Sequence, residues 1–530
     1  MVTAIFLCMV RTIKFHLVNF EPKEVTQMSF YSEMEKILKK NKTLTENGGV
    51  GYETSGHALV DMNYKVASYR TANESTILAD FLKAFSETPE LAIKWMFYAG
   101  DIREGLGERR LFKILVKNVL PKYPWLIKFI PDYSRWDIVT ELLGTSVETE
   151  AVELIREQLK TDLDAMKAGK PISLLAKWMP SVNTSSKATV AKANKLCALL
   201  GMKPAEYRKT LSKLRAYSNV IEVKLCKNEW GDVNYEAVPS KANLKYKDAF
   251  LKHDEARRRE FLGKLTKGEA KINASAAFPH EVVYKYRSQS GTYSSTVDPA
   301  LEGMWKNLKS IEMTKPMIVV RDGSGSMECS VGCTMVLALD VATALAIYCS
   351  EHAAPGFENE FITFGEKPKL VKFSQNMTLR DKMTLAYYEA DCSNTDIEAT
   401  MDLILSTAKR SHLKQDQIPD VLIISDMEFD SATTCCKYRY SWQRPSTKDL
   451  PTVFESIRQK YKAEGYNLPG MVFWNVNSRT NAIPLQENKY GVKLLSGFSQ
   501  NVLNMAISNK FDPFDVLKET LLSKRYEVIK

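Results

Sequence analysis

The sequence predicts a protein of the α plus α/β class, in which an N-terminal α-solenoid is followed by a doubly wound parallel sheet. Two observations lead to this class. From residue 28 to about residue 310, apolar residues recur at helical spacing and strand-like runs are nearly absent. From Lys315 onward, short apolar runs rich in β-branched residues alternate with helical segments. Such alternation is typical of a parallel sheet covered by helices, whereas an unbroken series of helices indicates helix-on-helix packing.

Composition and cysteine usage exclude several classes of protein. Hydrophobic residues make up 45% and charged residues 26% of the 530 residues, which argues against intrinsic disorder for most of the chain. No uninterrupted apolar run approaches about 18 residues, so we expect no membrane-spanning helix. The nine cysteines form no CxxC pair, and the six histidines form no HxxxH pair. We therefore expect neither a disulfide framework nor a structural zinc site, and a location in a reducing cytoplasm.

The first 27 residues lack helical periodicity, turn chemistry and the layout of a signal peptide. Lys23-Glu24-Val25 can be encoded by AAGGAGGT, a ribosome-binding sequence, and Met28 follows at the spacing of bacterial initiation. We expect translation to start at Met28, so that residues 1–27 are a mis-annotated or disordered leader. The same observation predicts a bacterial or bacteriophage gene, and thus a bacterial host cell.

Residues 28–310 form the predicted helical module. Helices are predicted at residues 33–42, 75–86, 90–99, 108–119, 147–166, 186–200, 203–216 and 242–266, with a glycine-rich loop at 45–53. Successive helices without strands favour a solenoid of stacked, HEAT-like helix pairs. No clean repeat of fixed length accompanies the pattern, so the solenoid is predicted from architecture alone.

Positive charge is concentrated in this helical module. Residues 1–310 carry 48 basic and 36 acidic residues, a balance of +12, whereas residues 311–530 carry 25 and 27, a balance of −2. Residues 151–300 alone contribute 27 − 16 = +11. Such an asymmetry suggests that the basic part meets an anionic polymer. The alternative is a solvated, lysine-rich helical surface.

Several clusters in the basic part place Lys and Arg beside aromatic residues. Cations of this kind can meet RNA phosphates, while rings and guanidinium planes stack on bases. The candidate RNA-contacting residues are Arg103, Arg109, Arg110, Lys177, Arg208, Lys209, Lys213 and Arg215. The alternative for each cluster is an ion-paired helix end around a core aromatic residue.

Residues 311–530 form the predicted α/β domain. Strands are predicted at residues 316–320, 360–364, 421–425, 471–475 and 492–495. Helices are predicted between and after them, at residues 334–349, 396–409 and 513–522. Asp512 can cap the last helix, and Pro513 suits its first position.

Polar residues follow the predicted strands where a doubly wound sheet binds ligands. Asp322-x-Ser324-x-Ser326 follows the first strand, Thr395 opens a helix, and Asp426 follows the strand 421–425. Hydroxyls and carboxylates make a hard, oxygen-rich site that suits Mg²⁺ or Mn²⁺. The alternative is a serine-capped turn with buried aspartates at the strand ends.

These residues make 311–530 resemble a von Willebrand factor A domain with a metal ion-dependent adhesion site (MIDAS). With its helical first half, the chain resembles the Ro autoantigen and its TROVE module, and especially an uncharacterised bacterial and phage branch. The motifs that carry the resemblance are GDIREGLGERRLF (100–112), AKWMPSVN (176–183), YRKTLSKLR (207–215), NYEAVPSKA (234–242) and VFWNVN (472–477). The resemblance implies a helical ring that binds single-stranded RNA ends and small structured RNAs and is closed by the A domain.

Two functions follow as hypotheses. The first is an RNA-binding scaffold for small noncoding or single-stranded RNA, with Mg²⁺ or Mn²⁺ at Asp322, Ser324, Ser326, Thr395 and Asp426. The second is a metal-dependent protein-interaction or adhesion module, which binds a partner's carboxylate and has no nucleic-acid role. An enzyme is not expected, because the chain has no Walker A, HExxH or GxSxG sequence.

Overall fold

The structure is a computed structural model that describes most of the chain from residue 42 onward. The described residues are 42–44, 50–287, 294–311, 313, 315–332, 334–365, 367–390, 396–428, 453–478, 483, 492–508, 510 and 512–530. The predicted leader 1–27 and the ligand Thr395 lie outside them. Thr43–Lys530 forms one compact unit, and the description below concerns this unit.

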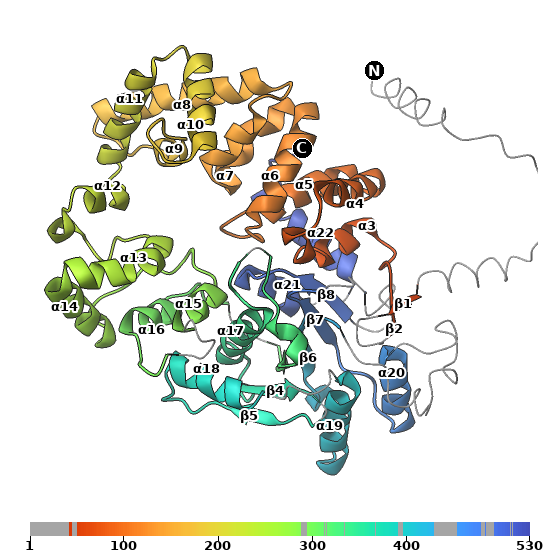
Figure 1. The fold of residues 1–530 in the computed structure, drawn as a ribbon. Coiled ribbons are helices and arrows are strands. Elements are labelled where there is room, and N and C mark those ends of the chain that lie inside the picture. Colours follow the sequence, from red (N-terminus) through yellow and green to blue (C-terminus); the bar gives the residue numbers. More distant parts are fainter. Residues whose placement is uncertain are drawn as a thin grey trace, which may run out of the picture. The chain divides into compact units, whose positions relative to one another are not determined.

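The first part of this unit is built from helices, as predicted (Figure 1). Consecutive helices pack on one another, including α3 on α4, α4 on α5, α5 on α6 and α13 on α14. The helices are α3 (Ala58–Tyr64), α4 (Glu74–Glu87), α5 (Pro89–Gly100), α6 (Arg109–Val119), α7 (Ile130–Tyr133), α8 (Glu148–Lys167), α9 (Leu175–Trp178), α10 (Lys187–Leu200), α11 (Pro204–Tyr217), α12 (Ile221–Cys226), α13 (Ser240–His253), α14 (Glu255–Thr266), α15 (Pro279–Tyr286) and α16 (Pro299–Lys306). A regular HEAT-like repeat stays a prediction.

Two predictions for this part were wrong. The segment 242–266 is not one helix but two, because the backbone of Asp254 leaves the helical region (φ −146°, ψ 52°) between α13 and α14. The Asp254 carboxylate accepts hydrogen bonds from Tyr235 (2.7 Å) and Arg257 (2.8 Å), which hold this break. The predicted loop 45–53 contains strand β2 (Val50–Tyr52), which pairs with β1 (Lys42–Leu44) in a two-stranded sheet.

The second part contains a six-stranded sheet in the order β5-β4-β3-β6-β7-β8. Its strands are β3 (Met317–Asp322), β4 (Glu360–Phe364), β5 (Leu370–Lys372), β6 (Asp420–Ser425), β7 (Met471–Asn475) and β8 (Val492–Ser496). All neighbouring pairs are parallel except β4 and β5. The sheet is therefore mixed, not purely parallel. Sequence periodicity missed β5 because this edge strand has three residues and buries only the middle one.

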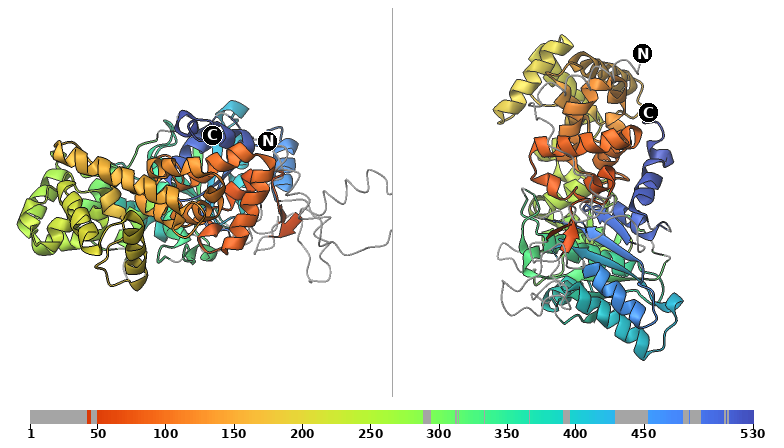
Figure 2. Two further views of the ribbon diagram at one scale, coloured as in Figure 1. Left: turned by 90° about the horizontal axis from the view of Figure 1, so that it is seen from above. Right: turned by 90° about the vertical axis from the view of Figure 1, so that its right-hand side faces the viewer.

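Helices cover both faces of this sheet, which agrees with a doubly wound arrangement (Figure 2). Alternate strand residues enter two separate hydrophobic clusters because successive side chains of a strand point to opposite faces. Val319 and Leu422 join the cluster that contains α17 (Ala338–Glu351) and α18 (Leu379–Tyr388). Val320 and Ile423 join the cluster that contains α19 (Ile397–Arg410) and α20 (Val453–Ala463).

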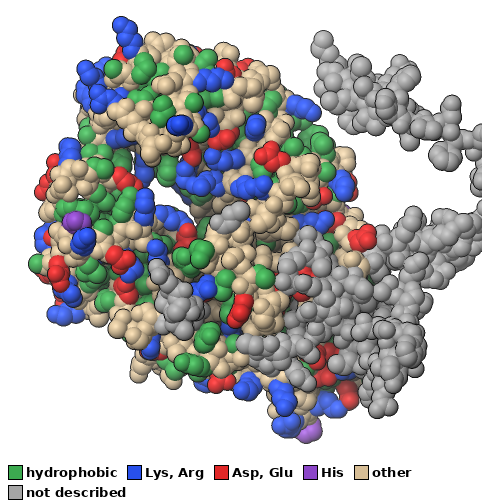
Figure 3. All heavy atoms as spheres, viewed as in Figure 1, with side chains coloured by type: hydrophobic (Ala, Val, Ile, Leu, Met, Phe, Trp, Pro, Cys, Tyr) green, Lys and Arg blue, Asp and Glu red, His purple; other side chains and the backbone are tan. Residues whose placement is uncertain are grey.

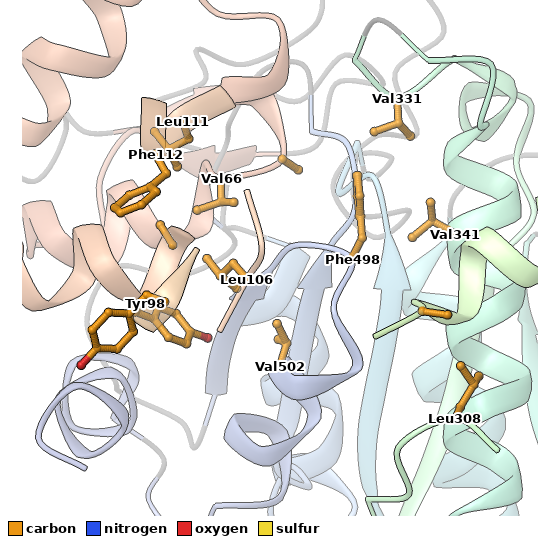
Figure 4. Close-up of a cluster of buried hydrophobic side chains, with 14 of the residues drawn as sticks. Val66, Tyr98, Leu106, Leu111, Phe112, Leu308, Val331, Val341, Phe498 and Val502 are labelled. Carbon is orange, nitrogen blue, oxygen red and sulfur yellow. The ribbon is translucent and has the colours of Figure 1, made fainter. Parts of the chain in front are cut away.

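The helical part and the α/β domain share one hydrophobic core. Figure 4 shows Leu106 from the helical part near Val502 from the α/β domain, and both belong to one cluster of buried residues. At its beginning the helical part packs through α3 and α5 on β8, α22 (Pro513–Leu521) and the C-terminal turn η12 (Lys524–Tyr526). At its end it packs through α15 on α17. Both ends of the helical part therefore contact the α/β domain.

The last helix begins as the sequence predicted. Asp512 accepts hydrogen bonds from the backbone N–H groups of Phe514 (2.8 Å) and Asp515 (3.0 Å), and Pro513 occupies the first helical position. The Asp512 carboxylate thus pairs two backbone N–H groups at the helix N-terminus that have no carbonyl partner within the helix. Among the helices of the described segments, none is long and apolar enough to cross a membrane.

Candidate functional site

Three predicted metal ligands lie on one turn at the C-terminal end of β3. The Ser324 N–H donates to Asp322 Oδ1 at 2.9 Å, and the hydroxyl oxygens of Ser324 and Ser326 lie 2.9 Å apart. Gly323 keeps the turn compact, since a Cβ there would lie 3.2 Å from the Cβ of Ala390. The structure brings both serine hydroxyls together, as the metal-site prediction requires.

Asp426 lies at the end of the neighbouring strand. Arg321 pairs with Ile424 in the β3–β6 register, so Asp322 lies level with Ser425, and the Ser425 hydroxyl donates to Asp322 Oδ2 at 2.5 Å. Asp322 and Asp426 are both fully buried. After β3 the chain first forms β4, which lies on one side of β3, and later forms β6, which lies on its other side. The two aspartates therefore flank a topological switch point, where sheets of this kind bind ligands.

Opposing effects act on the pKa of the Asp322 carboxyl. Burial raises this pKa above its ordinary range, while hydrogen bonds from Ser425 and Ser324 and the charge of Arg321 oppose that shift. A nearby cation would favour the charged carboxylate in the same way. Hydroxyl and carboxylate oxygens are ligands that Mg²⁺ and Mn²⁺ prefer, so the side chains at this turn fit the predicted ion.

Thr395, the fifth predicted ligand, cannot be placed because it lies outside the described residues. Within the part of the chain that the structure describes, no group of three or more His, Cys, Asp or Glu side chains could hold a metal ion. That finding concerns nitrogen, sulfur and carboxylate clusters, whereas the predicted site relies on hydroxyl groups.

Sequence reasoning missed a buried carboxylate beside this site. Glu428 is fully buried, its N–H donates to Asp426 Oδ1 at 3.3 Å, and its carboxylate accepts from the Ser478 hydroxyl at 3.3 Å. The Ser478 N–H donates to Asn475 Oδ1 at 2.8 Å, and Asn475 Nδ2 donates to the carbonyl of Tyr64 at 3.0 Å. Hydrogen bonds thus link the C-terminal end of β7 to α3. The only signal in the sequence was a carboxylate two residues after Asp426.

The candidate RNA-contacting residues of the 100–110 segment differ in exposure and partners. Arg103 and Arg109 are exposed, and the structure gives their guanidinium groups no ion pair within the described residues. The guanidinium of Arg110 instead donates to the carbonyls of Tyr69 (2.5 Å) and Ala72 (2.8 Å). Arg110 therefore holds the turn before α4 and has fewer donors left for a ligand.

Arg215 and Lys177 lie where α9 meets α11. The Arg215 guanidinium donates to the carbonyls of Ala176 (2.7 Å) and Met179 (2.9 Å) and to the hydroxyl of Ser181 (3.0 Å). Arg215 is therefore an anchor between two helices, which matches the structural alternative for its cluster. Lys177 is half-buried, with its ammonium 5.4 Å from the centre of the Trp178 ring.

Arg208, Lys209 and Lys213 are exposed residues of α11. The buried side of this helix carries Tyr207 and Leu211. Within the described residues, none of the three cations forms an ion pair. In Figure 3, Lys and Arg side chains also border a hollow between the helices at the top and left of the view. The structure therefore leaves three of the four predicted cations of this helix available to a ligand.

Comparison with known proteins gives two family matches and two similarities that cover most of the chain. Residues 149–314 match a family described as a domain of unknown function (DUF2828), and residues 316–524 match another (DUF7788). "Uncharacterized protein L728" of Acanthamoeba polyphaga mimivirus is 27% identical over 527 residues, covering 91% of this chain and 87% of that protein. The crystal structure of the RO (RSR) protein of Deinococcus radiodurans aligns over 95% of each chain, with 13% identity and a TM-score of 0.35. The two family matches meet between α16 and β3.

Proposed function

We propose that this chain is an RNA-binding scaffold that takes small noncoding or single-stranded RNA on its basic helical part. The observation that carries the proposal is the exposed side of α11, where Arg208, Lys209 and Lys213 point away from the core. Arg215, on the same helix, donates three hydrogen bonds to α9 and the residues that follow it. The helix is thus anchored by one cation and presents three others.

The chemistry of this face suits a phosphate backbone. Residues 151–300 carry a net charge of 27 − 16 = +11, and unpaired surface cations release counterions when they meet phosphates. The helical part also contains a stacked pair, in which the guanidinium of Arg135 lies 3.7 Å from the centre of the Trp178 ring. Stacked cation and ring pairs of this kind also suit unpaired bases.

The test is the salt dependence of binding to a single-stranded RNA. Replacing Arg208, Lys209 and Lys213 together by Gln should make the slope of log K against log salt shallower by about 2, at about 0.7 per lost phosphate contact. A matched control replaces Arg410, Lys414 and Lys518 of the α/β domain by Gln, because these are exposed cations without an ion pair in the described residues. Equal slopes in wild type and the α11 variant would remove this helix from the interface.

We further propose that the α/β domain holds Mg²⁺ or Mn²⁺ and has no catalytic role. Asp322, Ser324, Ser326 and Asp426 would hold the ion together with Thr395. The ion would supply a positive centre that can accept an anionic oxygen from a partner. Because the basic surface and the hydroxyl-carboxylate turn lie on different parts of the chain, chelation should leave RNA affinity within about 1.4 kcal/mol. An Asp426→Ala variant that melts normally but loses RNA affinity by about a hundredfold, or 2.7 kcal/mol, would contradict this division.

A second candidate function is metal-dependent binding of a protein partner. Tyr387 (44% exposed) and Tyr388 (78% exposed) end α18, and Ala390 packs on Gly323 of the metal turn. Exposed aromatic residues are enriched in protein interfaces, and a metal ion beside them could take a partner's carboxylate. Purified protein that carries no nucleic acid, judged from its ultraviolet spectrum, would favour this second candidate.

A further inference from the structure

The loop between α5 and α6, residues 101–108, is folded back tightly onto α5. The N–H of Leu106 donates to the carbonyl of Tyr98 (3.1 Å), and the N–H of Glu108 donates to the carbonyl of Ala99 (2.8 Å). Gly105 makes this return possible, since a Cβ there would lie 2.0 Å from the Tyr98 carbonyl oxygen. The loop is therefore an ordered element of the helical part.

The C-terminal turn η12 binds this loop through a buried carboxylate. Asp101 is fully buried and accepts from Arg525 Nε at 2.9 Å, from Arg525 Nη2 at 3.1 Å and from the Tyr526 hydroxyl at 3.0 Å. The same carboxylate accepts the N–H of Arg103 at 2.9 Å. Asp101 thus shapes its own loop and binds the end of the chain at the same time.

Further contacts hold the loop and the C-terminal turn together. The Tyr133 hydroxyl donates to the carbonyl of Arg525 at 2.6 Å, and the rings of Tyr133 and Tyr526 stack with centroids 5.5 Å apart. Asn501 Nδ2 donates to the carbonyls of Arg103 (3.1 Å) and Gly105 (3.3 Å). The α/β domain therefore satisfies backbone and side-chain groups of the loop that would otherwise be buried without partners.

The outer side of the same loop carries predicted RNA contacts. Arg103 lies in the loop and Arg109 directly after it, and both are exposed. A loop that is already ordered loses less conformational entropy when its arginines bind a ligand, so binding is stronger. Contacts made on the inner side by residues about 400 positions away can therefore affect binding on the outer side.

We propose that Arg525 and Tyr526 are positioning residues for RNA binding: through Asp101 they fix the 101–108 loop so that Arg103 and Arg109 face the RNA. This inference rests on the proposed RNA-binding function. On this proposal the two sides of the motif GDIREGLGERRLF have different roles. The inner side joins the two parts of the chain, and the outer side presents cations.

The experiment compares Arg525→Gln with the matched control Lys524→Gln. Lys524 is the neighbouring residue of the same turn, is exposed, and forms no ion pair in the described residues, so both variants lose one charge. Amide hydrogen exchange is followed in the full-length protein at residues 102–108 and, as an internal reference, in β3 and α17. Arg525→Gln should accelerate exchange in the loop by about tenfold and leave the reference amides unchanged, whereas the control should change neither.

RNA affinity is then measured for the same proteins with an oligouridylate of about 20 nucleotides. Arg525→Gln should weaken binding by about tenfold and the control by less than about twofold, and Arg525→Lys should restore part of the loss. If Arg525→Gln does not fold, Tyr526→Phe, which removes one hydrogen bond to Asp101, replaces it with a smaller expected effect. Unchanged loop exchange would overturn the positioning role whether or not the protein binds RNA. Faster exchange with unchanged RNA affinity would overturn the link to RNA, while the α11 variant independently tests the proposed function.

Discussion

Two glycine-rich loops of this chain have the same local geometry and different surroundings. In the 101–108 loop, Asp101 accepts the N–H of Arg103 at 2.9 Å, and in the turn after β3, Asp322 accepts the N–H of Ser324 at 2.9 Å. Both aspartates are fully buried. Asp101 is also bound by the guanidinium of Arg525, whereas Asp322 is bound by the neutral hydroxyl of Ser425.

The two buried aspartates are compensated in different ways. A buried carboxylate is costly unless a cation or several hydrogen bonds compensate its charge. Asp101 receives its cation from the end of the same chain, so it joins two parts of the structure. The hydrogen bonds of Asp322 come from neutral donors, and the buried guanidinium of Arg321 also favours its charged form without a direct hydrogen bond between the two.

The largest expected effect is the difference in stability when one methyl group is added to each loop. Gly105→Ala should destabilise the protein by about 3 kcal/mol or more, because the new Cβ meets the Tyr98 carbonyl oxygen at 2.0 Å. Gly325→Ala should have little effect on stability, since nothing lies within 4 Å of a Cβ at that position. Denaturant unfolding measures both, and equal losses would show that the loops are not packed differently.

The second prediction concerns the ion. Mg²⁺ or Mn²⁺ at about a hundredfold excess over its Kd should stabilise the folded protein by about 2.7 kcal/mol, because it binds the folded state. Asp322→Ala should abolish this gain. Asp101→Ala should lower stability but keep the gain, since Asp101 belongs to the joint with the C-terminal turn. Thermal melting with and without the ion measures the effect, and an equal gain in wild type and Asp322→Ala would contradict the metal site.

The third prediction tests the packing of the buried His280 by pH. Burial lowers the pKa of His280, which packs on the ring of Phe498, to about 3 from 6.5. Below pH 6.5 the unfolded chain takes up a proton that the folded protein does not, so stability falls with falling pH. The loss at pH 5 is about 2 kcal/mol. His280→Gln should flatten unfolding free energies between pH 7 and pH 5, and the exposed His412→Asn should not. A wild-type slope in His280→Gln would be evidence against a neutral, buried histidine.

The last prediction separates an anchoring cation from an exposed one on α11. Arg215→Met should cost about 2 kcal/mol, because the carbonyls of Ala176 and Met179 lose a charged donor. Lys213→Met should change stability by less than about 0.5 kcal/mol, since Lys213 is exposed. Urea titrations of the two variants provide the comparison, and similar losses would mean that Arg215 is not the anchor.

Sequence periodicity predicted most of the local structure. The predicted helix 90–99 corresponds to α5 (Pro89–Gly100), and the predicted strand 471–475 to β7 (Met471–Asn475). These segments carry long, regular apolar patterns, which reflect the face that each element buries. Periodicity failed at Asp254, where one polar residue breaks an otherwise continuous helical pattern, because the break depends on partners from elsewhere.

For the candidate sites, local sequence was enough to show which residue types stand at the strand ends and where positive charge accumulates. The pattern Asp322-x-Ser324-x-Ser326 after an apolar run was enough to place two hydroxyls on one turn, because a tight turn fixes neighbours within a few residues. The folded structure was needed to show that Arg110 and Arg215 bind carbonyl groups while Arg208 and Lys209 face solvent. It also showed that Asp101 meets Arg525, more than 400 residues away. The partners of a long cationic side chain belong to elements distant in sequence, so the local sequence pattern does not predict them.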